Sequence, residues 1–343
     1  MKSTLKRLLR DKATPLLVIL IVLMLFTMVM SSGVLDGAPI SAMFTEGFMA
    51  RVNILSNFYN LVIQIFMLVG LSCILISGNI DLSIAGQAML GSLIFAKICA
   101  DTALPWGIAF LITMVVAVVF GLINTVMVNY LRFPAFIATI GASSIYSGLC
   151  NVITGGNNIQ IARESFLQIG KTVYFGVLPL TFVMAIIVLV VFQFVLTKTT
   201  FGRSLFMAGG NPTAARLCGL NSNRMRMIMF IVNSVLSVLG GILYASQLCL
   251  ASPTNLVTSA PNMTATSAAI LGGVAFTGGA GNLVGPLIAL VLINVFENML
   301  GVLGVGSYWV VFAQGVLLLL ALIIDYVSAN RREKAMLKSA MEN

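Results

Sequence analysis

Long apolar segments separated by short polar breaks recur along almost the whole chain, and they limit what it can fold into. Hydrophobic residues make up 59% of the 343 positions and charged residues only 8%, far from the balance of a soluble globular domain. About 20 consecutive apolar residues cross a bilayer as an α-helix. The pattern therefore predicts an all-α, polytopic membrane protein with about ten transmembrane helices.

The apolar runs form one membrane domain with a polar segment at each end. We expect residues 1–13 to be a cytoplasmic N-terminus, 14–327 the membrane bundle and 328–343 a cytoplasmic tail, so that 1–343 is a single transmembrane domain. The first run lacks the A-x-A pattern of a cleavage site, which favours a retained anchor over a signal peptide. The expected spans are Pro15–Met30, Tyr59–Ile76, Ile84–Cys99, Trp106–Tyr130, Ala135–Ile153, Gly176–Leu196, Met227–Leu248, Met263–Thr277, Leu283–Leu303 and Ser307–Tyr326.

The basic residues orient this topology. With both termini cytoplasmic, the cytoplasmic segments hold 15 of the 19 Lys and Arg residues: five before the first span, Arg132, five between spans six and seven, and four in the tail. The external segments hold the other four, which are Arg51, Lys97, Arg163 and Lys171. Positive charge gathers on the cytoplasmic side of membrane proteins, so this asymmetry supports the predicted topology.

Several kinds of chemistry are missing from the sequence. It has no histidine, the commonest metal ligand and general base, and its five cysteines form no Cys-x-x-Cys pair. We therefore expect no metal site, no catalytic residue and no cofactor bound by this chain. The net charge of +9 lies at the ends of apolar runs and predicts contact with lipid and no binding of nucleic acid.

Ionisable residues inside the predicted spans are scarce. Only Glu297 falls in the middle of a span, next to Asn298. A charge there costs about 2.5–3.5 kcal/mol on insertion scales, so this side chain should face the bundle interior or be protonated. It is either a group that touches solute or a buried packing residue. Asp81 and Asp325 fall at span ends, where we expect them to reach water.

The longest interruption of the apolar pattern is the central loop, residues 198–226, with five basic residues and no acid. Asn211 is a good N-cap, Pro212 suits the first helical position and Gly219 a helix stop. These signals predict a short cytoplasmic helix from Pro212 to Cys218. It is either a capped surface helix or a docking element for a partner that supplies energy.

Several motifs resemble those of one transporter family. Gly78–Ser83 (GNIDLS) is similar to its G-G-I-D-L-S, with Asn79 in place of the second glycine. Phe133–Gly141 (FPAFIATIG) resembles its P-x-F-I-A-T-L-G, and the central loop resembles its T-x-F-G-R…G-G-N-x-x-A-A-R-L-S-G, with Cys218 in place of serine. On these motifs the chain is identified as a permease subunit of the bacterial ATP-binding-cassette sugar importers, the ribose/xylose/galactoside type within the branched-chain/monosaccharide superfamily.

The resemblance implies a multi-pass permease in the bacterial cell membrane that forms the translocation path for a monosaccharide or sugar-like solute. The implied partners are ATPase subunits that bind and hydrolyse ATP, a second permease copy or paralogue, and an extracytoplasmic solute-binding protein. It implies coupling to the ATPase through Gly209, Gly210, Asn211, Ala214, Ala215, Arg216 and Gly219, and family motif positions at Gly78, Asp81, Ser83 and Pro134.

Spans five and eight are unusually rich in small and hydroxyl residues, which a helix facing lipid does not need. We expect the path to be lined by Thr139, Ser143, Ser144, Thr264, Thr266, Ser267, Glu297 and Asn298. The alternative is that the small residues serve close helix packing. Two other functions stay open: the same type of permease for a nucleoside, a branched-chain amino acid or a signalling molecule, and an ion-coupled secondary transporter.

Overall fold

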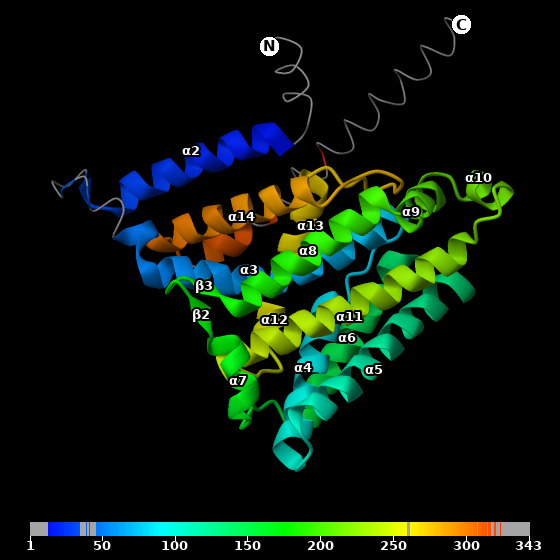
Figure 1. Cartoon of the computed structure of the whole chain (residues 1–343), viewed down its shortest axis with the longest axis horizontal. Helices are drawn as coiled ribbons and strands as arrows, with labels where there is room; N and C mark the ends of the chain where they lie inside the picture. The colour runs from blue at the N-terminus through cyan, green and yellow to red at the C-terminus, as the bar shows by residue number, and fades with distance from the viewer. Residues whose placement is uncertain are drawn as a thin grey trace, which may run out of the picture.

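The computed structural model describes residues 13–34, 46–258 and 261–306, positions 39 and 41, and part of 308–323. Over these residues it is a helical bundle with two very small sheets (Figure 1). The long helices are α2 (Ala13–Ser31), α3 (Arg51–Ile76), α4 (Ile84–Asp101), α5 (Trp106–Thr125), α6 (Ala135–Thr154), α8 (Leu180–Lys198), α11 (Ser222–Leu248) and α14 (Val284–Val302). The shorter ones are η3 (Gly47–Met49), the π-helix η4 (Val126–Tyr130), α7 (Glu164–Lys171), α9 (Thr200–Gly210), α10 (Pro212–Leu217), α12 (Asn255–Thr258) and α13 (Pro261–Leu271).

The all-α polytopic fold class predicted from the sequence is confirmed. Within the described residues, seven helices are long and apolar enough to span a membrane. The apolar part of α2, Pro15–Ser31, is shorter than these seven. The eighth expected span forms only α13, whose 11 residues are about half the length that crosses the hydrocarbon. The tenth expected span, Ser307–Tyr326, lies largely outside the described residues.

Helix α3 forms the centre of the bundle. Every residue from Leu61 to Ile76 is buried, and α8, α11, α13 and α14 all pack against this helix. A helix that is apolar on all sides belongs inside a bundle, which accounts for its position. α3 begins at Arg51, earlier than the predicted Tyr59, because its polar first turns pack against η3 and α14.

Helix α11 lies against α3, α4 and α5 and holds them together through glycine contacts. A Cβ at Gly241 would overlap the carbonyl oxygen of Ala88 in α4. A Cβ at Gly240 would lie 2.9 Å from the Cβ of Phe66 in α3. Small residues allow helix backbones in a membrane to approach closely, which is the main source of attraction between them.

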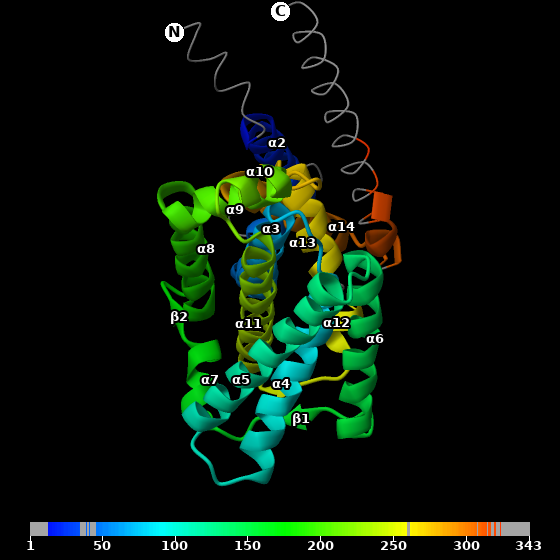
Figure 2. The same ribbon diagram turned by 90° about the vertical axis from the view of Figure 1, so that its right-hand side faces the viewer.

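The two ends of the bundle differ. α9 and α10 lie at one end, and α7 and strand β1 (Ile159–Gln160) lie at the other (Figure 2). β1 pairs antiparallel with β4 (Leu250–Ala251), and β2 (Val173–Tyr174) pairs with β3 (Leu178–Pro179).

Three of the four basic residues expected outside make local contacts that explain their presence there. Arg51 donates to the carbonyl oxygen of Gly176 at 2.8 Å, and Arg163 to that of Thr102 at 2.6 Å. Lys97 forms an ion pair with Asp101 at 2.9 Å. The two arginines connect segments far apart in sequence, whereas Lys97 pairs within α4, so each of these charges has a partner in the fold.

Candidate functional site

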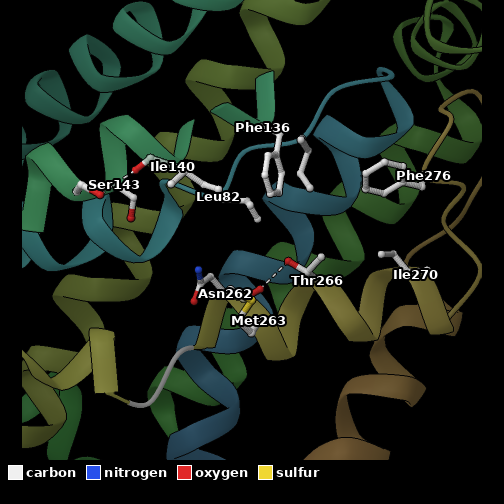
Figure 3. A pocket seen from close by; sticks show the side chains of 11 residues that line it. Leu82, Phe136, Ile140, Ser143, Asn262, Met263, Thr266, Ile270 and Phe276 are labelled. Carbon is white, nitrogen blue, oxygen red and sulfur yellow. Dashed lines mark hydrogen bonds between the residues drawn. The ribbon is translucent and has the colours of Figure 1, made fainter. Parts of the chain in front are cut away.

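A cavity of 510 Å³ lies between α6, α13 and two non-helical segments. The first break, residues 77–83, connects α3 to α4, and the second break, residues 272–283, connects α13 to α14. The residues that line the cavity are Ile80, Leu82, Phe136, Ile140, Ser143, Ser144, Asn262, Met263, Thr266, Ile270 and Phe276 (Figure 3). Irregular backbone at membrane depth is tolerated where it is buried in protein or borders a cavity, and both breaks meet this condition.

The first break is fixed by a polar network around Asp81. One carboxylate oxygen accepts from the backbone N–H and the hydroxyl of Ser83, and the other from the amides of Asn124 in α5 and Asn233 in α11. Gln87 in α4 donates to the Ser83 hydroxyl at 2.7 Å. Four donors therefore satisfy the carboxylate, and the break is tied to three helices.

The expectation that Asp81 reaches water is wrong, because the residue is fully buried. Apolar periodicity placed it at a span end, but the chain is exposed only at Gly78 and is buried again from Asp81 onward. A carboxylate can stay buried when donors from several helices surround it. Asp325 lies outside the described residues.

Helix α6 also contacts the first break. The backbone N–H of Leu82 donates to the Thr139 hydroxyl oxygen at 3.1 Å, and that hydroxyl donates to the carbonyl of Ala135 at 2.8 Å. Thr139 is fully buried, so it supports the cavity wall from behind. Pro134, another motif position, directly precedes α6 and accepts from Ala138 at its first turn.

The structure separates the other residues predicted for the path into two groups. Ser143, Ser144 and Thr266 line the cavity, with their oxygens on opposing helices. Thr264 and Ser267 are buried in α13 and are not part of the lining. In Figure 3, Phe136 and Leu82 lie across the space from Thr266 and Met263.

Glu297 and Asn298 lie away from this cavity, near the C-terminal end of α14. The amides of Asn298 and Asn53 form a reciprocal pair, with N–O distances of 2.9 and 2.7 Å. One turn earlier, Asn294 donates to the Gln64 side-chain oxygen at 2.5 Å. These amide pairs fasten α14 to α3, and Glu297 stands beside them with intermediate exposure.

The central loop folds as two short helices, and the sequence predicted only the second. The Asn211 side chain caps α10 by accepting from the N–H groups of Thr213 and Ala214 at 3.1 and 2.9 Å, as predicted. Helix α10 ends at Leu217, and Gly219 adopts φ +79°, a left-handed conformation that favours glycine. Ala214 has intermediate exposure.

Exposure divides the residues that the resemblance assigns to ATPase coupling. Gly209 and Ala215 are buried, whereas Gly210, Arg216 and Gly219 are exposed. Leu217 is 86% exposed and is the leucine of the A-A-R-L-S-G motif, although it was not among the residues predicted for coupling. An apolar and a basic side chain, Leu217 and Arg216, therefore lie exposed next to each other at the end of α10.

The residues of other helices that hold the first break in place were not predicted from the sequence. Asn124, Gln87 and Asn233 belong to three helices, and no local pattern connects them to Asp81. The one available signal was their type, because asparagine and glutamine are costly inside apolar helices unless they are paired. Phe136 belongs to the motif Phe133–Gly141 but was not predicted to line the path, and nothing in the sequence pointed to Phe276.

Among the described residues, no group of three or more His, Cys, Asp or Glu is placed to hold a metal ion. What the fold offers is a solute-sized cavity between interrupted helices and a capped, basic two-helix loop at one end. That combination defines a membrane transport permease.

Comparison with known proteins places the chain more closely. The profile of the family described as "Branched-chain amino acid transport system / permease component" matches residues 53–322. The match covers most of the chain, so the protein belongs to this family of ABC-transporter permeases.

Curated relatives agree with this placement. The chain is 29% identical to the autoinducer 2 import system permease protein LsrC of Photorhabdus luminescens over 264 residues, covering 77% of this chain and 78% of the relative. It is 28% identical to LsrC of Yersinia pestis (strain Pestoides F), covering 77% and 74%, and 29% identical to LsrC of Salmonella paratyphi B, covering 76% and 75%.

Membership of the family has direct consequences. The protein is a multi-pass membrane protein of a bacterial ABC import system. It is a transport subunit and not an enzyme. Permeases of this family bind no cofactor, and ATP is hydrolysed by a partner ATPase. The family also implies a solute-binding protein as partner.

Proposed function

We propose that the chain forms the translocation path for a monosaccharide or sugar-like solute, and that the cavity between α6, α13 and the two breaks is part of that path. The observation that carries the proposal is the lining itself: hydroxyls from α6 and α13 face a space that also carries two phenylalanine rings. A volume of 510 Å³ is within the range of about 300–1,000 Å³ for small-molecule sites.

Seven of the eleven lining residues are apolar and four are polar, so the lining offers a small neutral solute a few hydrogen-bonding groups within a mostly apolar wall. The hydroxyls of Ser144 and Thr266 donate to carbonyls of their own helices, which leaves their oxygens free to accept from solute hydroxyls. The rings of Phe136 and Phe276 offer flat apolar faces to the C–H face of a sugar ring. None of the eleven lining residues is charged, which disfavours a zwitterionic amino acid as cargo.

The relatives add a second candidate within the same class. Their names record import of autoinducer 2, a sugar-like signalling molecule. The family is established by the profile match, and identity of 28–29% to these relatives leaves the cargo open, so a signalling molecule of sugar-like chemistry is the runner-up to a nutrient monosaccharide.

Uptake by the reconstituted complex of this chain with its ATPase and binding protein tests the cargo. We expect ATP-dependent uptake of a labelled pentose, and competition by other monosaccharides or autoinducer 2. Leucine and a nucleoside should not compete. Competition by leucine alone would refute the sugar proposal. Uptake by the chain alone, driven by an ion gradient, would instead indicate a secondary transporter.

A variant pair tests the cavity. Thr266→Val removes a lining hydroxyl at constant shape, and we expect the KM for uptake to rise about three- to tenfold, the value of one hydrogen bond. Ser267→Ala removes a neighbouring hydroxyl that does not line the cavity and should leave KM unchanged. Equal effects of the two variants would contradict the assignment of the path.

We further propose that α10 is the docking element for the ATPase. The support is the exposure of Leu217 and Arg216 on a rigidly capped helix in a loop with five basic residues. Leu217→Glu should lower capture of the purified ATPase about tenfold or more, as expected for an apolar anchor. Phe175→Glu, a change at a 95% exposed residue of the opposite end, should leave capture intact.

A second permease copy fits the same arrangement. The cavity adjoins the side of α6 where Phe136 and Ile140 are exposed, so another subunit placed there would close it. We propose that the chain pairs with a copy or paralogue across α6. The domain assignment of 1–343 as a single permease domain is part of this proposal, as is the cytoplasmic placement of both termini.

A further inference from the structure

Three segments that are far apart in the sequence meet through their backbones where the first helix of the central loop ends. They are the C-terminal end of α9, the first break and the second break, and each contributes glycine at the meeting point. We name this contact the glycine seam and define it as Gly78, Gly209, Gly210, Gly278 and Gly279.

We propose that the glycine seam is the joint that transmits movement of the central loop to both walls of the cavity, with Gly209 as the positioning residue at its centre. This inference rests on the proposed function of α10 as docking element and of the cavity as path. It names the route between them.

The seam contains no side chains that could absorb a displacement. A Cβ at Gly209 would overlap the carbonyl oxygen of Ile76, the last residue of α3. A Cβ at Gly278 would lie 2.7 Å from the Cα of Gly78 and 2.9 Å from the oxygen of Gly209. In addition, the N–H of Gly279 donates to the oxygen of Ile76 at 2.9 Å. Backbones in direct contact must shift together or separate, because rotamer changes cannot take up the motion.

On the side of the loop, the seam is joined to α10 by a stiff connection. Asn211 ends α9, donating from its N–H to the carbonyl of Met207, and begins α10 as its cap. Buried Ala215 accepts from the N–H of Leu220 at 2.9 Å, which closes the turn after α10. A push on Leu217 therefore moves the end of α9 rather than bending a flexible linker.

On the side of the cavity, the distance from the seam to the lining is short. Ile80 and Leu82 follow Gly78 in the first break, and Phe276 precedes Gly278 in the second. The first break is also held by the Asp81 network to α4, α5 and α11. A displacement at the seam thus reaches two walls of the cavity within four residues of the contact.

Two helical glycines supply a matched pair of variants. Gly209→Ala forces a methyl group onto the Ile76 oxygen, whereas a Cβ at Gly107 in α5, outside the glycine seam and the central loop, would meet no atom within 4 Å. In the complex with ATPase and binding protein, we expect Gly209→Ala to keep ATPase capture and ATP hydrolysis within about twofold and to lower solute uptake about tenfold or more. Gly107→Ala should keep all three near native.

A native complex that captures no ATPase or moves no solute overturns the proposed function before any variant is compared. If the native complex works, native uptake by Gly209→Ala overturns the joint alone, and so does an equal loss in Gly107→Ala. Should Gly209→Ala fail to assemble, hydrogen exchange in the native complex decides. ATP binding should then change amide exchange in both breaks together and leave α7 at the opposite end unchanged. Unchanged exchange in either break overturns the joint.

Discussion

Replacing Asp81 by asparagine tests whether the buried network holds an ionised carboxylate. The substitution keeps the shape and one acceptor oxygen, but it turns the other oxygen into an NH2 group. That group then faces the amide donors of Asn124 and Asn233. In the native protein these donors lie 3.1 and 3.0 Å from the carboxylate oxygen. Asn124 also donates to Ser83 at 2.8 Å, so it cannot rotate its amide without losing that bond.

The expected loss of unfolding free energy follows from these contacts. Each buried donor left without an acceptor costs about 1–3 kcal/mol. Removal of a buried charge returns part of this, because desolvation of the carboxylate no longer opposes folding. A rotation of the Asn233 amide, whose oxygen has no partner, recovers some more. We therefore expect Asp81→Asn to destabilise the fold by about 2–4 kcal/mol.

Equilibrium unfolding in mixed detergent micelles measures the change, and Asp101→Asn is the control. Asp101 makes an exposed ion pair with Lys97, four residues away in the same helix, worth about 0.3–0.5 kcal/mol. The same chemical change should therefore cost several times more at position 81. A loss at Asp81 no larger than that at Asp101 would refute the reasoning, since asparagine would then mimic a carboxyl group that is already neutral.

Three further predictions use the same unfolding assay. Gly241→Ala places a methyl group against a carbonyl of α4 and should cost about 1–3 kcal/mol, whereas Gly107→Ala meets no atom within 4 Å and should be neutral; similar losses would contradict the packing argument. Thr139→Val removes the acceptor of a backbone N–H in the first break and should cost about 1–3 kcal/mol, with no loss counting against its supporting role. Asn53→Ala and Asn298→Ala should be coupled by about 1 kcal/mol in a double-mutant cycle, and additive losses would show that their paired amides do not stabilise the fold.

Local features of the fold were predictable because local physics decides them. The cap at Asn211 and the stop near Gly219 depend on residues within one helical turn, and both appear as predicted. The long spans follow from apolar length alone. Helix ends were less predictable: α3 extends outward to Arg51 because tertiary contacts with α14, such as Asn53 with Asn298, stabilise turns that hydropathy assigns to water.

The candidate site was less predictable, because its contacts join residues far apart in sequence. Ser143, Ser144 and Thr266 were expected at the path and line the cavity, since small polar residues in a membrane helix carry a signal of their own. Nothing local distinguishes them from Ser267, which is buried behind the lining. Neighbouring positions of a helix point in different directions, and only the packing of α13 against α3 and α14 decides which of them meets the cavity.

The two breaks show how a permease can be both stable and movable. The first break is fixed on one side by four donors to Asp81 and is in contact on the other with backbone alone, at Gly209 and Gly278. Buried polar networks resist deformation because each unpaired group is costly. Contacts between backbones without side chains pass a displacement from one segment to the next. They can also separate with the loss of one hydrogen bond, that from the N–H of Gly279 to the oxygen of Ile76. We therefore expect movement to occur at the seam and not at Asp81, so that the cavity wall pivots about the carboxylate when the central loop is displaced.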